Sequence, residues 1–335
     1  MTIVDSLNRP LRHLRISVID QCNLRCTYCM PAEVFGQDYV FLPQSQLLSF
    51  EEIERLAKIF ASMGVEKIRL TGGEPLLRKG LPELIERLIN IADIKDVSLT
   101  TNGLLLGVYA ARLRAAGLQR INVSLDSLND KTFGEMNGRR IAVDKVLQSI
   151  EQATTAGLQI KINMVVQKGV NNQDVMEMAK YCFEKGYTLR FIEYMDVGNT
   201  NRWDMAQVVP SRDILNMLRQ QHELIPTTPV EKGIVAKNYI YKGTTKEVGF
   251  ISSVTEAFCS DCNRARVSAD GKLYTCLFAN RGTDLKALLQ SSTDDEVRRE
   301  IVHIWNGRRD RYSEERSIVG NNRSDSKIEM SYIGG

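Results

Sequence analysis

The sequence predicts an α/β fold, a partial TIM-like (β/α)6 barrel followed by a smaller C-terminal domain. Short strand-like runs alternate with helical stretches between residues 14 and 194, and six βα repeats of this kind imply parallel strands. A length of 335 residues also suits roughly two domains. A doubly wound open sheet is the less favoured alternative.

The elements follow one another regularly along the chain. Ser49 and Glu52 form a capping box that opens a helix running to about residue 63. The six predicted strands cover residues 14–18, 67–70, 96–99, 120–125, 160–165 and 189–194. A glycine closes a helix before several of these strands, at Gly64, Gly117, Gly157 and Gly186.

The pattern loosens after about residue 209. A helix is predicted over 211–221, two prolines follow, and strand-like runs return at 239–241 and 248–252. We therefore expect residues 1–224 to form the barrel and residues 225–335 to form the smaller domain, which ends in a Gly-Gly tail.

Composition and charge are those of an ordinary globular protein, with 43% hydrophobic and 25% charged residues. The net charge of +3 is too small to predict binding to nucleic acid. No apolar run approaches 18 residues, and the first 17 residues do not resemble a secretory signal. We expect a cytoplasmic protein with no membrane and no nucleic-acid partner.

Every predicted strand alternates polar and apolar side chains, although parallel strands covered on both faces are usually apolar throughout. Alternate side chains share a face, so the apolar set packs on helices and the polar set faces the barrel lumen. Because unpaired buried charges are costly, the sequence predicts a polyanionic ligand. For Arg120, the alternative is an outward position at a strand end. The cationic side chains of this face are Arg15, Lys67, Arg69, Arg120, Lys161 and Arg190.

Six of the seven cysteines form two triplets. Structural zinc normally takes four Cys or His ligands, and no histidine lies at a short spacing from either triplet, although folding could bring His13 near. Three thiolates on a 4Fe-4S cluster leave one iron open, so an iron–sulfur cluster is favoured over zinc for both. Cys182 is expected to be a small buried hydrophobic residue. The triplets are Cys22, Cys26 and Cys29, and Cys259, Cys262 and Cys276.

The first triplet directly follows the first predicted strand. In parallel α/β folds the reactive face lies at the carboxyl ends of the strands, where residues 71–75 (TGGEP), 100–103 (TTNG) and 124–127 (SLDS) also lie. Each segment alone is compatible with an ordinary turn. Together they predict one rim at which the open iron faces the lumen.

Residues 22–29 (CNLRCTYC) resemble the cluster motif of the radical S-adenosylmethionine superfamily, and residues 72–75 (GGEP) resemble its methionine-binding turn. The resemblance extends over nearly the whole chain to the family within this superfamily that cyclises GTP in the first step of molybdenum cofactor biosynthesis. The segments that carry it are 15–18 (RISV), 26–31 (CTYCMP), 124–128 (SLDSL), 191–195 (FIEYM), 259–266 (CSDCNRAR) and 333–335 (IGG).

The resemblance implies a reaction and its cofactors. A 5′-deoxyadenosyl radical from S-adenosylmethionine would abstract the ribose 3′ hydrogen of GTP, giving (8S)-3′,8-cyclo-7,8-dihydroguanosine 5′-triphosphate. Two 4Fe-4S clusters are implied, the second in the C-terminal domain, with its open iron offered to guanine. A downstream partner, cyclic pyranopterin monophosphate synthase, would use the product. The electron donor is left unknown, and so is the oligomeric state, for which a homodimer is one outcome.

The resemblance also assigns residues. Cys22, Cys26 and Cys29 would hold the catalytic cluster, with Arg264 and Arg266 beside the second one. Thr100 and Ser124 have an alternative role as polar filling of the barrel, and Met195 as core. Contacts to S-adenosylmethionine are implied for Tyr28, Gly73, Glu74, Ser124 and Met195. Contacts to GTP are implied for Arg15, Lys67, Arg69, Thr100, Lys161, Arg190, Arg264 and Arg266.

The C-terminal tail and three rival functions complete these expectations. Gly334 and Gly335 are implied to reach the active site, although such a tail is usually frayed. A peptide-modifying radical enzyme with an auxiliary cluster would not need so many lumen cations. A zinc-binding or electron-carrying module leaves the polar strand face unexplained. A GTP-binding switch lacks its usual phosphate loop, since no GxxxxGK[ST] segment is present.

Overall fold

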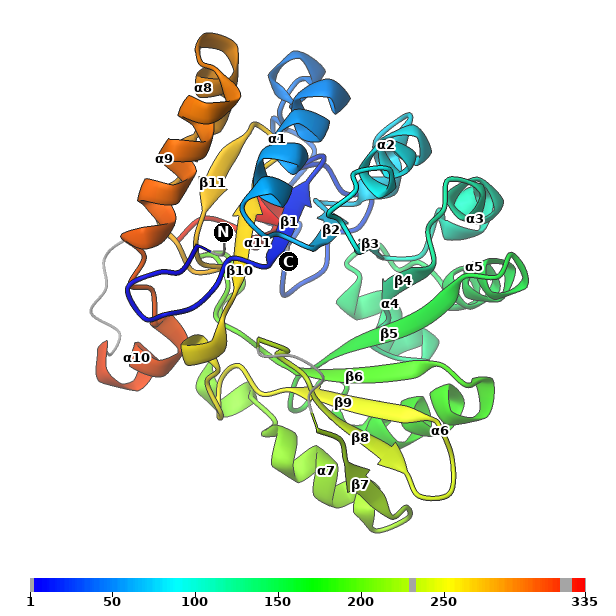
Figure 1. Cartoon of the computed structure of the whole chain (residues 1–335). Helices are drawn as coiled ribbons and strands as arrows, with labels where there is room; N and C mark the ends of the chain where they lie inside the picture. The colour runs from blue at the N-terminus through cyan, green and yellow to red at the C-terminus, as the bar shows by residue number, and fades with distance from the viewer. Residues whose placement is uncertain (1–2, 229–232, 320–326, 335) are drawn as a thin grey trace.

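One open sheet of 12 strands forms the centre of the computed structural model, which describes residues 3–228, 233–319 and 327–334. The strand order is β12-β11-β10-β1-β2-β3-β4-β5-β6-β9-β8-β7, and β1 to β6 are parallel to their neighbours. Figure 1 shows these strands as an arc with the helices outside it. The predicted α/β fold is therefore confirmed, and the strand order from β1 to β6 is the one that a partial (β/α)6 barrel requires.

Each of these six strands begins within one residue of its predicted start. Their alternating pattern is a local signal, so it could be read along the chain without knowledge of the tertiary contacts. The strands are β1 His13–Ser17, β2 Lys67–Thr71, β3 Asp96–Thr101, β4 Arg120–Ser124, β5 Gln159–Val166 and β6 Thr188–Glu193.

The connecting helices cover the outer face of the sheet. The predicted capping box is present, because the Ser49 hydroxyl accepts from the Glu52 amide and the Glu52 carboxylate accepts from the Ser49 amide. The four glycines expected to end helices all have positive φ. The helices are α1 Phe50–Ser62, α2 Leu81–Ile89, α3 Leu106–Ala115, α4 Asp130–Met136, α5 Asp144–Thr155 and α6 Val175–Lys185.

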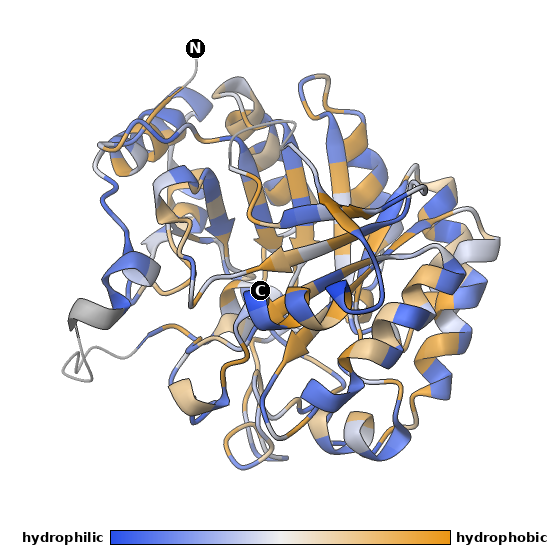
Figure 2. Cartoon of the chain, turned by 90° about the horizontal axis from the view of Figure 1, so that it is seen from below, coloured by the Kyte–Doolittle hydropathy of each residue, from blue (hydrophilic) through white to orange (hydrophobic). Residues whose placement is uncertain are grey.

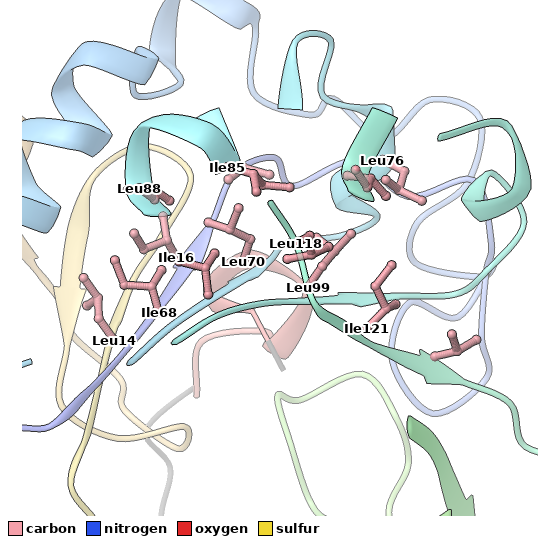
Figure 3. Close-up of a cluster of buried hydrophobic side chains, with 14 of the residues drawn as sticks. Leu14, Ile16, Ile68, Leu70, Leu76, Ile85, Leu88, Leu99, Leu118 and Ile121 are labelled. Atoms are coloured by element: carbon pink, nitrogen blue, oxygen red, sulfur yellow. The ribbon is translucent and has the colours of Figure 1, made fainter. Parts of the chain in front are cut away.

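The core lies between the sheet and these helices. Leu14 and Ile16 of β1 and Ile68 and Leu70 of β2 are at most 1% exposed. Figure 3 shows them grouped with Ile85 and further side chains of the cluster. Each such burial stabilises the fold by about 1.5–3 kcal/mol. The outer helices carry both blue and orange residues in Figure 2, as amphipathic helices do.

Residues beyond the barrel extend the same sheet at both edges. Strand β10 is parallel to β1, and β9 is parallel to β6, so the two edge strands of the barrel are covered. The boundary expected at residue 225 remains a prediction. The elements here are α7 Ser211–Arg219, β7 Leu224–Pro226, β8 Lys237–Tyr241, β9 Glu247–Ile251, β10 Arg264–Val267, β11 Lys272–Tyr274, β12 Thr283–Asp284, α8 Leu285–Ser291, α9 Asp294–Asn306, α10 Tyr312–Val319 and α11 Met330–Ile333.

Across the three described stretches of the chain, no helix is both long enough and apolar enough to span a membrane. The buried Cys182 of α6 is 1% exposed and packs in the core, as expected.

Candidate active site

The first cysteine triplet lies in the loop after β1, at the carboxyl end of the sheet. Arg25 holds this loop from within: its Nε donates to the Phe35 carbonyl at 2.5 Å and its Nη1 to the Cys22 carbonyl at 2.8 Å. The amides of Arg25 and Thr27 also donate to the carbonyls of Asn137 and Met136, both at 3.0 Å. The loop is thereby fixed to the end of α4.

The three cysteines are half-buried, and their thiols are close enough for their charges to interact. Burial, followed by the charge of the nearby Glu74, raises the pKa of Cys22 to about 11. Burial, followed by the charges of Cys22 and Cys29, raises the pKa of Cys26 well above its ordinary value. Three mutually repelling thiolates are stable here only with a cationic group between them, and metal binding would deprotonate the thiols. The donor set therefore fits an iron–sulfur cluster.

The turn after β2 packs directly on the cysteine loop. A β-carbon at Gly73 would overlap the Gln21 carbonyl oxygen, and the Gly73 amide donates to the Ile19 carbonyl at 2.7 Å. Gly72 has φ of 153°, and a β-carbon there would overlap the carbonyl oxygen of Ile19. Only glycine permits this close approach of two backbones.

Glu74 is buried at the end of the same turn, 1% exposed. Its carboxylate accepts from the Thr101 hydroxyl and the Asn102 amide, both at 2.7 Å, and from the Leu76 amide at 3.0 Å. Burial raises its pKa to about 7, although these hydrogen bonds oppose the rise. Asn102 also donates to the Asn23 side chain at 2.7 Å, so the ends of β1, β2 and β3 form one polar unit.

Tyr28 of the cysteine loop donates its hydroxyl hydrogen to Asp126 at 2.7 Å. Asp126 follows β4, is 6% exposed, and also accepts from the Val165 amide at 2.9 Å. Burial raises the pKa of Asp126 to about 6. Sequence reasoning quoted Asp126 in a strand-end segment but gave it no role. Ser124 ends β4, and Met195, which is half-buried, follows β6.

The lumen wall concentrates positive charge. Arg15 on β1 is in register with Arg69 on β2 and with Arg266 on β10. Burial, followed by the charges of Arg190 and Arg120, lowers the pKa of Arg69 to about 9. Burial and the charges of Arg266 and Arg69 likewise lower the pKa of Arg15 well below its ordinary value. Such mutual repulsion is relieved by an anionic ligand.

Other residues of the lumen wall contribute to the same positive electrostatic field. Burial lowers the pKa of Lys161 on β5 to about 8, and Arg190 on β6 also lowers it. Lys67 opens β2, two residues before Arg69. Some polar atoms of this wall are buried without a hydrogen-bond partner, as expected for a site that binds a polar ligand. These atoms are Thr100 Oγ1, Asn122 Oδ1, Asn163 Oδ1 and Arg190 Nε.

Arg120 pairs with Asp96 at the start of the neighbouring strand β3, and their side chains are 22% and 23% exposed. Arg120 still contributes to the lumen field, because it lowers the pKa of Arg190. Sequence analysis missed Asp96 as its partner, since an acid at the first residue of a strand gives no sign of its cross-strand neighbour. Arg120 thus combines the predicted contribution to the lumen field with an ion pair near the start of its strand.

The second cysteine triplet lies beside the lumen arginines. Arg264 of β10 donates to the Cys262 Sγ at 3.4 Å, and the Phe278 amide donates to the Cys276 Sγ at 3.5 Å. Burial alone would raise the pKa of Cys262, but Arg264 and Arg308 lower it to about 6. Because β10 is parallel to β1, Arg264 and Arg266 extend the cationic wall toward this triplet.

The C-terminal tail enters this region. The Arg266 guanidinium donates to the Gly334 carbonyl, and a β-carbon at Gly334 would overlap the Thr71 side chain at the end of β2. Figure 1 shows α11, just before Gly334, inside the arc beside β1. Gly335 lies outside the described residues.

Both triplets have the composition of iron–sulfur sites. Among the described residues, no three His, Cys, Asp or Glu side chains are arranged around a point where a single metal ion would bind. A 4Fe-4S cluster does not need that arrangement, because each thiolate binds a different iron atom.

A parallel α/β sheet with three cysteines after its first strand and a Gly-Gly-Glu turn after its second defines the class as a radical S-adenosylmethionine enzyme. Residues 16–182 match the family described as the Radical SAM superfamily, and residues 187–314 match Molybdenum Cofactor Synthesis C. The chain is 50% identical over 337 residues to the GTP 3′,8-cyclase of Staphylococcus epidermidis, and 49% identical over 336 residues to that of Staphylococcus aureus. Each alignment covers 99% of both chains. The chain belongs to the GTP 3′,8-cyclase family.

A solved structure agrees with the fold. Streptococcus suis SuiB bound to S-adenosylmethionine superposes with a TM-score of 0.60 at 15% identity, over 89% of this chain and 66% of that one. This similarity supports the common architecture alone.

Proposed function

We propose that this chain converts GTP to (8S)-3′,8-cyclo-7,8-dihydroguanosine 5′-triphosphate, the first step of molybdenum cofactor biosynthesis. Membership of the GTP 3′,8-cyclase family supports this reaction. One observation carries the proposal: mutually repelling cations gather on neighbouring strands, where Arg15 of β1 is in register with Arg69 and Arg266, and Arg264 extends this group to the second cysteine triplet. A nucleoside triphosphate is a ligand with enough negative charge for that wall.

We further propose a 4Fe-4S cluster on each triplet of a partial (β/α)6 barrel, the second one in the C-terminal part of the chain. When bound and reduced, the first cluster would supply the one electron that cleaves S-adenosylmethionine to methionine and a 5′-deoxyadenosyl radical, and the second would offer an open iron to guanine. The thiols that would hold them are Cys22, Cys26 and Cys29, and Cys259, Cys262 and Cys276.

The rim residues bind and orient S-adenosylmethionine in this proposal. Gly73 lets the turn pack directly on the cysteine loop, which places the turn where the methionine end would bind, and the Glu74 carboxylate fixes the Leu76 amide at the end of that turn. Ser124 and Met195, at the ends of β4 and β6, suit the nucleoside end. The Tyr28 ring is fixed by its bond to Asp126, so it can exclude water from the same space.

The lumen residues bind the triphosphate. Arginine forks donate to phosphate oxygens in pairs, and the neighbouring arginines on β1, β2 and β10 offer several such forks at one level of the barrel. Thr100, whose hydroxyl has no hydrogen-bond partner within the described part of the chain, is available to the ligand. The residues assigned to GTP are Arg15, Lys67, Arg69, Thr100, Lys161, Arg190, Arg264 and Arg266.

The chemistry of the reaction indicates where the protein works and which partners it needs. Thiols that bind clusters must stay reduced, which supports a cytoplasmic location. The cyclised triphosphate would pass to cyclic pyranopterin monophosphate synthase, and a one-electron donor must reduce the first cluster.

The test is an anaerobic incubation of the iron-loaded enzyme with S-adenosylmethionine, dithionite and GTP. We expect 5′-deoxyadenosine and a nucleotide product with the mass of GTP, both dependent on GTP. Lys161→Met should lower formation of both, whereas Lys185→Met, at an exposed surface position, should not. If cleavage of S-adenosylmethionine did not depend on GTP but increased with a peptide substrate, a peptide-modifying enzyme would be favoured instead.

A further inference from the structure

A buried pair of arginines holds the loop of the second cysteine triplet from behind. Arg9 and Arg308 each have a side chain 1% exposed, and both contact the fully buried carboxylate of Asp5, at 2.6 Å and 3.4 Å. Asp5 in turn accepts from the Leu7 and Arg9 amides, both at 2.9 Å. Figure 1 shows the blue N-terminal segment running beside the end of α9, and Arg308 follows α9 by two residues in the sequence.

Both arginines reach the backbone of the cysteine loop. The Nη1 of Arg9 donates to the Cys259 carbonyl at 2.7 Å and to the Asp310 carbonyl at 2.8 Å. The Nη1 of Arg308 donates to the Cys262 carbonyl at 2.7 Å. Two cysteines of the triplet are therefore fixed by guanidinium groups that belong to the two ends of the chain.

The side chains behind the loop are themselves locked in place. The Trp305 indole donates to the Arg9 carbonyl at 3.1 Å, and the Arg308 guanidinium lies 4.6 Å from the centre of the Trp305 ring. The Ser6 hydroxyl donates to the Arg308 carbonyl at 2.6 Å. This packing leaves the two guanidinium groups little freedom, so they can act as fixed charges.

The fully buried part of this arrangement carries more positive than negative charge. Two guanidinium groups share the Asp5 carboxylate, whereas Asp310, a second acidic partner of Arg308, has a side chain 33% exposed. Arg308 also interacts with the side chain of Cys262, one of the thiols that would bind the cluster. The Nη2 of Arg9 is also buried, and it has no hydrogen-bond partner among the residues that the structure describes. A buried cation with an unused donor is costly unless an anionic acceptor is added.

We propose that Arg9 and Arg308 are positioning residues of the second cluster: they fix the Cys259–Cys262 loop and supply the positive charge that a thiolate-bound cluster requires. This inference rests on the proposed function, since it needs a cluster on this triplet. It goes beyond that function because neither arginine lies on a barrel strand and neither is among the residues assigned to GTP. Removing the Arg308 charge should make the cluster harder to reduce, because each added electron increases its negative charge.

The test uses Arg308→Met, with Arg309→Met as the matched control at the exposed neighbouring position. Both changes are placed in a chain whose Cys22, Cys26 and Cys29 are replaced by alanine, so that only the second triplet can bind iron. Iron content after anaerobic reconstitution and the midpoint potential of the remaining cluster are then measured. Arg308→Lys, which keeps the charge but loses the planar fork, is measured beside them.

We expect about four irons per chain in the parent and in the control. Arg308→Met should lose iron or shift the midpoint potential to a more negative value, and Arg308→Lys should recover part of that change. A parent without iron would overturn the second cluster itself, together with this inference. Full iron and an unchanged potential in Arg308→Met, even with a lower unfolding temperature, would overturn the inference alone and leave the proposed function standing.

Discussion

Replacing Arg69 by methionine should change stability and substrate binding in opposite directions. Arg69 lies in register with Arg15, and its own side-chain hydrogen bond is a long one, 3.4 Å to Ser98. Neighbouring strands are about 5 Å apart, and at an effective dielectric constant of about 20 two unit charges at that distance repel by about 3 kcal/mol. Without GTP, Arg69→Met should therefore unfold at an equal or higher denaturant concentration than the wild type.

The same change removes a donor to the triphosphate. A charge-assisted hydrogen bond contributes about 1.5–3 kcal/mol, so the KM for GTP should rise roughly 10- to 150-fold. Urea unfolding of the metal-free protein and steady-state kinetics of the loaded enzyme measure the two effects. Arg87→Met, which removes a surface arginine paired with Glu51, serves as the control for both.

A different result would refute this reasoning. Arg69→Met could instead destabilise the metal-free protein by several kcal/mol and leave the KM for GTP unchanged. The charged side chains of the lumen would then stabilise the fold and would not bind the substrate. The claim that these side chains bind an anionic ligand would then be wrong.

Three further predictions concern the rim and the clusters. Burial raises the pKa of Glu74 from 4.5 to about 7, so the native state holds a proton that the unfolded state releases, and the metal-free protein should lose about 3 kcal/mol as pH rises through this window. Urea unfolding at pH 5 and pH 8 measures this loss. The free energy of unfolding should change less between the two pH values in Glu74→Gln than in the wild type, and an equal change in both proteins would contradict the prediction. Gly73→Ala should weaken S-adenosylmethionine binding at least about 10-fold by equilibrium dialysis, because its β-carbon overlaps a backbone carbonyl, whereas Gly36→Ala, with an ordinary 3.5 Å contact, should not. Cys26→Ala should abolish cleavage of S-adenosylmethionine, and Cys262→Ala should retain some cleavage but lose the nucleotide product; equal loss of both in each variant would argue against separate roles.

Local patterns explain why much of the fold was predictable. Polar and apolar residues alternate along each barrel strand, and the capping box before α1 is a signal contained within four residues. The cysteine spacing and the Gly-Gly-Glu turn are equally local, and the structure brings both to the same end of the sheet.

Contacts between distant segments could not be predicted from these patterns. The pairing of β10 with β1 places Arg266 next to Arg15, yet some 250 residues separate them. Asp96 and Arg120 form a pair across neighbouring strands. Arg9 and Arg308 read in the sequence as ordinary surface charges, and only the fold buries them together behind one cysteine loop. Such pairings depend on tertiary topology, which leaves no periodic trace in the sequence.

The measurement that tests the central claim most directly uses GTP carrying deuterium at the ribose 3′ carbon. The account holds that the lumen between the two triplets presents this ribose to the radical formed at the rim. It predicts that deuterium appears in 5′-deoxyadenosine by mass spectrometry, and that Arg69→Met lowers this transfer in proportion to product. Formation of 5′-deoxyadenosine without deuterium, at an undiminished rate, would contradict the account.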